Sequence, residues 1–469
     1  MLGLLVFLGC ALLLIVGYAL YGRLAEKVYG ADMQHVMPCV SKPDGVDFVP
    51  MPTWKILLIQ LLNIAGLGPV VGAVSGCLFG PAALLWIVVG CIFAGAMHDF
   101  LAALMSAEKD GANLPELVGE NLGRTVRYAM RGVCIFMLGM VGVVFTRMPA
   151  DMLGSLIPGT DPMWWGLAIL LYYFMATILP INAIIGRFYP LFGALFLFMA
   201  VGLAVALPLS GYTVLPNLDV LTNVHPKGVA LWPTIFVTIA CGAISGFHAT
   251  QSPMMVRCLP DIRKVRKVFY GAMIIEGLVA LVWATVGLTL RDVLAGLKPG
   301  AAVNEACQVL LGPVGAFFAV LGVVALAVTS GDTAMRSCRL MLADVLHLRQ
   351  RHAVSRLTLA VPLFACVVLI SHLDFDAIWR YFGWANQSLA CITLWTISVN
   401  LRNRGRFHWL ASVPALFMSA MCCTFLLYSP DCLIELPLGV STGVGCVFAA
   451  VCMALFLLRG RQGQGAARA

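Results

Sequence analysis

The sequence predicts an all-α polytopic membrane protein that crosses the bilayer about thirteen times. Hydrophobic residues make up 61% of the chain and charged residues 11%, a balance far from that of soluble domains. Apolar runs of about eighteen residues or more recur from end to end, and each can cross a hydrocarbon layer of about 30 Å. Basic residues gather in the short loops between these runs, as topology signals do. No polar stretch is long enough to build a separate soluble domain.

The order of the spans follows from the charge of the loops. With the N-terminus outside, 25 of the 30 basic residues fall in inner loops, which is the asymmetry of the positive-inside rule. A miscounted helix would invert every later loop. The predicted spans are 2–20, 55–75, 82–106, 127–147, 163–180, 187–208, 231–254, 268–290, 312–333, 354–371, 379–399, 407–427 and 438–458.

Charge and cysteine content exclude several classes of function. The net charge of +8 belongs to loop residues at helix ends, so we expect no nucleic-acid partner. The sixteen cysteines show no CxxC pair or metal-ligand spacing, so we interpret them as small buried side chains without a disulfide framework. Leu2–Leu20 lacks a basic leader and precedes Arg23 and Lys27, which predicts an uncleaved first span rather than a signal peptide.

The second span is interrupted by the stretch NIAGLGP, Asn63–Pro69. Glycine and proline free backbone N–H and C=O groups from the helix ladder. In hydrocarbon such groups are tolerated where they are buried in protein or line a cavity. A broken helix at mid-membrane is typical of a solute or ion site in a secondary transporter. The alternative is a ridge of small residues for close helix packing, formed by Gly68, Gly72, Gly76 and Gly80.

The seventh span carries a second polar run, CGAISGFHATQSP, Cys241–Pro253. So many hydrogen-bonding side chains are costly in a spanning helix unless they face a cavity. Polar contacts between helices are the alternative explanation.

The two interrupted spans, second and seventh, lie five helices apart. Five crossings invert the direction of the chain, so equivalent points have opposite orientation, which is the arrangement of an inverted-repeat transporter. We therefore predict a five-plus-five inverted repeat with two broken helices. The predicted parts are an N-terminal helix and connection (1–54), a first repeat (55–208), an outer loop (209–230), a second repeat (231–399) and two accessory helices with a tail (400–469).

Two loops of this arrangement carry features of their own. Residues 107–126 predict a short amphipathic helix at the inner face, with Asn113 as its cap and Pro115 in its first turn. The outer loop, 209–230, either acts as a lid or simply closes the fold.

Residues suited to ion coupling lie in five spans. Thr329 and Ser330 offer hydroxyl oxygens for a monovalent cation, together with unwound backbone near Ala65. His98 and Asp99 in the third span and Glu276 in the eighth are candidates for a proton relay, because ionisable groups in hydrocarbon are functional by default. His248 either carries a proton or stays a neutral hydrogen-bonding residue. Asp332 and Arg336, four residues apart, are expected to pair at the inner edge.

Several stretches together resemble the carbon starvation protein A (CstA) family. They include LNIAGLGPVVGA (62–73), GCIFAGAMHDF (90–100), DGANLPELVGENLG (110–123), INAIIGRFYPLFG (181–193), the run from Leu231 to Cys258, SGDTAMR (330–336) and RYFGWANQSLA (380–390). The resemblance implies a LeuT-like fold of the amino acid–polyamine–organocation superfamily. It also implies a transporter in the cytoplasmic membrane that scavenges carbon sources, peptides in some members and pyruvate in others, with proton coupling in the pyruvate importers. This chain stops soon after its thirteenth predicted span and lacks the C-terminal region of longer members.

We therefore expect a secondary active symporter, not an enzyme, that takes up pyruvate or a short peptide during nutrient limitation. The coupling ion is H+, or alternatively Na+, no other cofactor or metal is expected, and lipid surrounds the chain, whose C-terminus is cytoplasmic. A nutrient sensor without net flux is the alternative, and the oligomeric state is left open. The predicted substrate site comprises Asn63, Gly66, Gly68, Ser245, Gly246, His248, Gln251 and Ser252.

Overall fold

The computed structural model describes residues 1–157, 159–220, 222–350, 352–373, 375–429 and 434–459, with the side chains of 181–188, 375–377 and 380 left aside. The predicted tail, from residue 460 on, lies outside these ranges. Every regular element in the described ranges is helical. Within them, nine helices are long and apolar enough to cross a membrane, and Thr53–Ala65 with Gly68–Phe79 forms a tenth candidate, bent by 51°. The other three predicted spans fall on α9 (Pro162–Ile178), on α11 (Leu231–Thr238) with α12 (Gly246–Val256), and on α17 (Phe375–Asn403), so the number thirteen stays a prediction.

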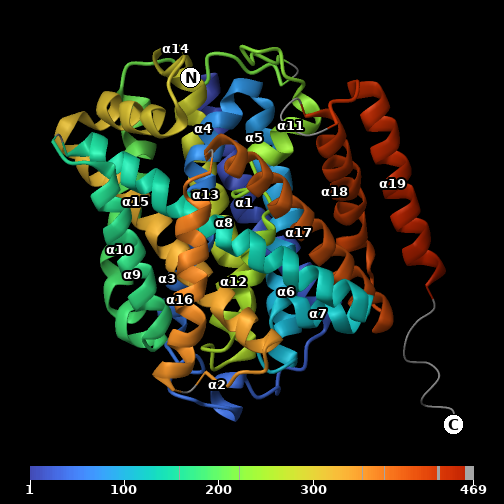
Figure 1. Ribbon diagram of the computed structural model, residues 1–469. Coiled ribbons are helices and arrows are strands. Elements are labelled where there is room, and N and C mark those ends of the chain that lie inside the picture. The colour runs from blue at the N-terminus through green and yellow to red at the C-terminus, as the bar shows by residue number, and fades with distance from the viewer. Residues whose placement is uncertain (158, 221, 351, 374, 430–433, 460–469) are drawn as a thin grey trace, which may run out of the picture.

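The helices form one bundle with two faces (Figure 1). We call the end that carries Met1 and α14 the upper face, and the end that carries α2 the lower face. The helices α18 and α19 stand side by side at one edge of the bundle (Figure 1). The helices outside the two interrupted spans are α1 (Leu2–Tyr29), α2 (Pro38–Ser41), α5 (Ala82–Gly90), α6 (Ala96–Glu108), α7 (Leu114–Leu122), α8 (Arg124–Leu156), α9 (Pro162–Ile178), α10 (Ile181–Leu209), α13 (Gly271–Thr289), α14 (Arg291–Leu294), α15 (Pro299–Val345), α16 (Ala353–Ile370), α17 (Phe375–Asn403), α18 (Trp409–Tyr428) and α19 (Leu438–Leu458).

The first interrupted span breaks where the glycines predict it. The helix α3 (Thr53–Ala65) ends at Gly66, whose φ of 45° and ψ of −146° leave the helical region. The chain resumes as a π-helix over Gly68–Gly72 and continues through α4 (Ala73–Gly76). A side chain at Gly66 would be strained at this φ, which explains why the break needs a glycine.

The second interrupted span breaks earlier than the polar run suggests. The helix α11 (Leu231–Thr238) ends above an irregular stretch, and α12 (Gly246–Val256) begins after Ser245. The irregular stretch contains Gly242, with φ 91°. A break that covers the whole polar run from Cys241 to Pro253, which that run predicts, is therefore wrong, because residues 246–256 are helical. Pro253 is held in the interior of α12, where tertiary packing offsets the loss of one backbone donor.

The loops predicted to share the inner side do meet at the lower face. Lys42 pairs with Asp110 at 2.7 Å, and Arg266 pairs with Glu26 at 2.9 Å. Arg404 pairs with Glu108. The helix α7 forms as predicted, with Pro115 in its first turn and Asn113 at the N-cap position, but the Asn113 side chain makes no capping hydrogen bond. The Asn113 side chain instead contacts Asp344 and Arg257.

Asp47, in the loop before α3, ties this face to α15. Its carboxylate pairs with Arg336 at 3.1 Å and with Arg339 at 3.7 Å, and it is 5% exposed. The predicted Asp332–Arg336 pair is thus wrong, because Arg336 turns to Asp47 and to the carbonyls of Ala176 and Leu179. Burial alone would raise the pKa of Asp47, but the guanidiniums of Arg336, Arg339 and Arg257 hold its pKa below the ordinary value.

Replacing Asp47 with Asn is expected to lower the free energy of unfolding by about 3 kcal/mol, because a buried arginine loses its counter-charge. The measurement is thermal unfolding of the purified protein. Since the pKa of Asp47 is depressed, its stabilisation is present above the unfolded value of 3.8 and is lost as pH falls below it. The control is Asp261→Asn, whose partner Arg263 has a side chain that is 71% exposed, so a change below about 0.5 kcal/mol is expected. Equal losses in both variants would contradict the role of Asp47.

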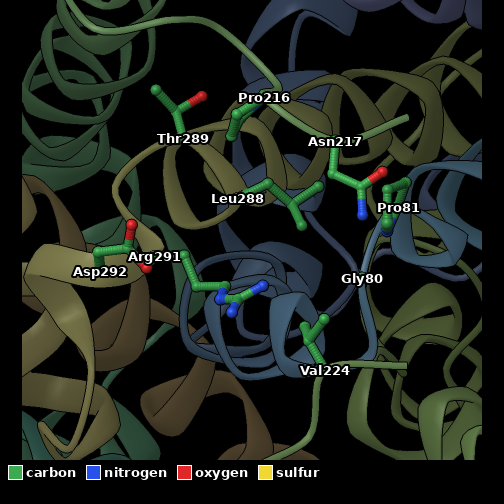
Figure 2. Close-up of a pocket in the computed structure, with 9 residues that line it drawn as sticks. All are labelled: Gly80, Pro81, Pro216, Asn217, Val224, Leu288, Thr289, Arg291 and Asp292. Carbon is green, nitrogen blue, oxygen red and sulfur yellow. The ribbon is translucent and has the colours of Figure 1, made fainter. Parts of the chain in front are cut away.

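The loop 210–230 covers part of the upper face. A hollow of about 170 Å³ lies between this loop, the start of α5 and the upper end of α13 (Figure 2). Pro216, Asn217 and Val224 come from the loop, whereas Arg291 and Asp292 come from α14 (Figure 2). The backbone N–H of Leu215 donates to the Thr289 hydroxyl at 3.2 Å. These contacts attach the loop to the bundle. That the loop acts as a lid, or that it simply closes the fold, both stay predictions.

Candidate functional site

The two breaks face each other in the middle of the bundle. A Cβ added to Gly68 would overlap the Cys241 side chain, and one added to Gly242 would lie 2.5 Å from Ala280 Cβ. A Cβ on Gly246 would overlap the backbone of Asn386 and Ala390 in α17. The glycines thus let four backbone segments approach one another, so packing and site formation both depend on them.

A cavity of about 610 Å³ leads from the upper face to these breaks. His225 and Lys227 of the loop and Ser429 after α18 line it, and so do Gly68, Cys241 and Asn386. Because the last three belong to the breaks and to α17, the cavity reaches the middle of the bundle. Its remaining lining is largely apolar, with Trp379 and Phe382 among its residues, as is usual for small-molecule sites. A separate hollow of about 520 Å³ opens at the lower face beside Asn113 and Asp344.

Asn386 organises the start of α12. Its Oδ1 accepts from the backbone N–H of Phe247 at 2.8 Å and from the Ser245 hydroxyl at 3.1 Å. Ser245, a predicted site residue, is therefore bonded directly to a residue that lines the cavity. Sequence reasoning missed Asn386, although a buried Asn within an apolar span is itself a signal of function.

The structure brings four predicted residues together in one buried group, which we call the histidine–carboxylate cluster: His98, Asp99, His248 and Glu276. Asp99 Oδ1 lies 2.8 Å from His98 Nδ1, and Asp99 Oδ2 lies 2.9 Å from His248 Nδ1. On the other side of the ring, His248 Nε2 lies 3.6 Å from Glu276 Oε2. All four side chains are 0% exposed. The elements that supply them are α6, α12 and α13.

Polar atoms in this cluster lack hydrogen bonds. Within the described residues, His98 Nε2, His248 Nε2 and both carboxylate oxygens of Glu276 have no hydrogen-bond partner. Cys241 comes close to two of these residues: its sulfur, one His248 nitrogen and one Glu276 oxygen lie within 4.8 Å of one another. Treating Cys241 as a mere small buried side chain thus missed its place at the centre of the site.

Thr329 and Ser330 meet the first break, as predicted, but at a different carbonyl. Both hydroxyl oxygens lie 3.0 Å from the backbone oxygen of Leu62, one turn before the predicted Ala65. The single proton of the Thr329 hydroxyl can instead go to the carbonyl of Ala325 or Leu326, each at 2.9 Å. Gly66 lies next to them, since a Cβ placed there would be 3.1 Å from Ser330 Oγ. The arrangement supplies hydroxyl and carbonyl oxygens at the end of α3, where helix carbonyls are left free.

Asn63 belongs to a second group, which we call the tyrosine–aspartate cluster: Asn63, Tyr172, Tyr189 and Asp332. Asn63, Tyr189 and Asp332 are buried, and Tyr172 is partly buried. The Tyr189 hydroxyl lies 3.0 Å from Asp332 Oδ1, 3.1 Å from Asn63 Oδ1 and 3.1 Å from the Thr329 carbonyl. The Tyr172 hydroxyl donates to Asp332 Oδ2 at 2.7 Å. Since a phenol has one proton, Tyr189 satisfies one of its three acceptors at a time. Sequence reasoning did not assign the two tyrosines or Asp332 to the site.

Two predicted substrate-site residues point elsewhere. Ser252 donates its hydroxyl to the His248 carbonyl at 3.0 Å, within α12. Gln251 donates from Nε2 to the Thr250 hydroxyl at 2.8 Å, and its Oε1 has no partner among the described residues. Both are buried below the cavity, so their direct contact with substrate stays a prediction.

Comparison with known proteins places the chain. The sequence model described as "Carbon starvation protein CstA" matches residues 2–160, 146–310 and 301–425. A membrane protein of Haemophilus influenzae is 39% identical over 65% of this chain and 95% of its own length. The peptide transporter CstA of Escherichia coli is 25% identical over 89% of this chain and 80% of its own length. The pyruvate/proton symporter BtsT of E. coli is 27% identical over 56% of this chain and 45% of its own length.

A solved structure shows the same fold. Mhp1, a nucleobase–cation–symport-1 family transporter with bromovinylhydantoin bound, matches with a TM-score of 0.57 at 13% identity, over 91% of this chain and 98% of its own. The predicted LeuT-like class of fold is thus confirmed, whereas the five-plus-five repeat itself stays a prediction. Since the family model spans most of the sequence, the chain belongs to the carbon starvation protein CstA family.

Proposed function

We propose that this protein is an ion-coupled secondary transporter that imports a small carboxylate-bearing carbon source, a pyruvate-like monocarboxylate or a short peptide. The observation that carries the proposal is the cavity that ends at two facing helix breaks. Broken helices at mid-membrane are the usual construction of transporter sites. The names of the E. coli relatives, a peptide transporter and a pyruvate/proton symporter, support both substrate classes.

The substrate carboxylate binds at the floor of the cavity, towards the N-terminus of α12. Helix N-termini attract anions through their free N–H groups and dipole. Gly246 begins α12, and Asn386 anchors that end from α17. Gly68 and Ser245 border the same space from the two breaks. No acidic side chain lines this cavity among the described residues, which favours a monocarboxylate over the amine of a peptide.

The coupling ion is H+, carried by Asp332. This carboxyl is fully buried between the phenols of Tyr172 and Tyr189. The nearest basic residue along α15, Arg336, lies one turn after Asp332, but it forms its ion pair with Asp47. When Asp332 is protonated it donates to Tyr189, which can then donate to Asn63 at the break of α3. Protonation thus changes how α3 is tied to α10 and α15, which links the ion to the substrate site. Thr329, Ser330 and the Leu62 carbonyl form the alternative site for Na+.

The upper face is external and the lower face cytoplasmic, in the cytoplasmic membrane, because the basic loops meet at the lower face. The two five-helix repeats move relative to each other, so that the substrate site opens in turn to the upper cavity and to the lower hollow. The ion pairs of Asp47 with Arg336 and Arg339 close the lower side while the upper cavity is open.

The test is uptake by proteoliposomes with an imposed proton or sodium gradient, comparing labelled pyruvate with a labelled dipeptide. We expect accumulation of pyruvate that follows the proton gradient and collapses with a protonophore. Accumulation driven by sodium alone would move the coupling site to Thr329 and Ser330. Saturable binding without accumulation in either gradient would contradict transport and favour a sensor.

A further inference from the structure

The site between Cys241, His248 and Glu276 has the chemistry of a transition-metal centre. It offers a thiol, an imidazole and a carboxylate, whose ligand atoms lie within 4.8 Å of one another. Ligands of this kind bind Zn²⁺ at about 2.0–2.3 Å in tetrahedral sites. Two ligands on one ion are then separated by about 3–4 Å, and the 3.6 Å between His248 Nε2 and Glu276 Oε2 falls in this range.

A second, independent observation is that the nitrogen and oxygen ligand atoms have no hydrogen-bond partner among the described residues. His248 Nε2 and both Glu276 oxygens lack hydrogen-bond partners within the described residues, although both side chains are 0% exposed. A buried carboxylate without hydrogen bonds is costly. A divalent ion would satisfy the imidazole nitrogen and the carboxylate at once.

The surrounding residues orient the ligands as outer-shell partners of a metal do. Asp99 Oδ2 lies 2.9 Å from His248 Nδ1, so that nitrogen donates and the lone pair of Nε2 points to Glu276. Asp99 is fixed in turn by His98 Nδ1 at 2.8 Å. Carboxylate–histidine–metal triads of this form fix the tautomer and raise the basicity of the ligand. On the other side, Cys241 Sγ lies 3.5 Å from the hydroxyl of Ser245.

We propose that Cys241, His248 and Glu276 bind one Zn²⁺ ion, and that its fourth coordination position takes an oxygen of the transported substrate. The second part rests on the proposed function. Catalytic zinc sites commonly combine three protein ligands with one exchangeable position. Cys241 lines the upper cavity, so this position is reached from the space in which the substrate carboxylate binds. A 2-oxo acid or a peptide terminus presents two donor atoms to such an ion.

The test is metal binding by the purified full-length protein. After equilibration with Zn²⁺ and removal of free ion, elemental analysis is expected to find about one zinc per chain. With Co²⁺ in its place, we expect visible d–d absorption of tetrahedral cobalt and a near-ultraviolet thiolate-to-cobalt band. Cys241→Ser should remove the thiolate band, and Asp99→Asn should weaken Zn²⁺ binding about 10–100-fold. The matched control is Cys338→Ser, a buried thiol in α15, which should leave stoichiometry and spectrum unchanged.

Less than about 0.1 zinc per wild-type chain would overturn the proposal, and the cluster would then hold only protons shared among His248, Asp99 and Glu276. Persistence of the thiolate band in Cys241→Ser would also overturn it. If Cys241→Ser does not fold, the zinc stoichiometry of the wild type and of Glu276→Gln still tests the proposal, because loss of this ligand should weaken Zn²⁺ binding. Adding pyruvate or a dipeptide should shift the cobalt absorption bands. If neither compound shifts them, the substrate does not occupy the fourth coordination position. These measurements need no transport, so they fail or succeed separately from the proposed function.

Discussion

Replacing Asp332 with Asn is expected to abolish uphill accumulation while leaving exchange of substrate across the membrane. Asn keeps the size of the side chain. Its one oxygen can accept from Tyr172 or Tyr189 and its NH2 group can donate to the other hydroxyl, but it cannot carry a proton. With one proton per monocarboxylate, each pH unit supports about tenfold accumulation, since one unit corresponds to about 1.4 kcal/mol. We therefore expect the accumulation ratio under a gradient of one pH unit to fall from about ten to about one.

The measurement is uptake of labelled pyruvate into proteoliposomes with and without the pH gradient, followed by counterflow with no gradient. Counterflow should remain within about threefold of wild type, because it needs substrate binding and access but no net proton movement. The control is Asp292→Asn in α14, an exposed carboxylate at the upper face, which should accumulate normally. Normal accumulation by Asp332→Asn would assign the proton to another group. Loss of counterflow as well would make Asp332 structural.

The positions of the breaks could be predicted because they depend on local chemistry. Gly66 and Gly242 adopt positive φ angles that side chains disfavour, and this need is visible in the sequence. The extent of the second break was wrong because polar residues and Pro253 do not by themselves unwind a helix. The hydroxyls of Thr250 and Ser252 bond to carbonyls of α12 itself, those of Phe247 and His248.

Pairings between distant segments could not be predicted. Spacing along one helix suggested Arg336 for Asp332, but Arg336 meets Asp47, which lies 289 positions away. Likewise, the spacing of Cys241, His248 and Glu276 along the sequence matches no metal-binding motif. The three residues come from the second break, α12 and α13, and only the fold brings them together. Sequence reasoning identified all four members of the histidine–carboxylate cluster as ionisable groups within the spans, yet only the packing of helices brings them together.

Gly246→Ala should cut uptake by at least about tenfold and lower the free energy of unfolding by about 1–3 kcal/mol. The added Cβ would overlap the backbone nitrogen of Ala390 and the backbone oxygen of Asn386, and neither backbone atom can rotate away. Overpacking of this kind costs about 1–3 kcal/mol. The shift of α12 away from α17 would also break the bond from Phe247 N–H to Asn386, which positions the helix N-terminus at the cavity floor.

The matched control has the opposite expected sign. Gly139 is buried in α8, and a Cβ placed there meets nothing within 4 Å. Gly139→Ala should therefore raise stability by up to about 1 kcal/mol, the gain in helix propensity, with uptake unchanged. Thermal unfolding and pyruvate uptake of the two variants are measured side by side. If Gly246→Ala is stabilising like Gly139→Ala, the close approach of α12 and α17 is not required. If it is destabilising but transports normally, the start of α12 is a packing element, and the carboxylate binds elsewhere in the cavity.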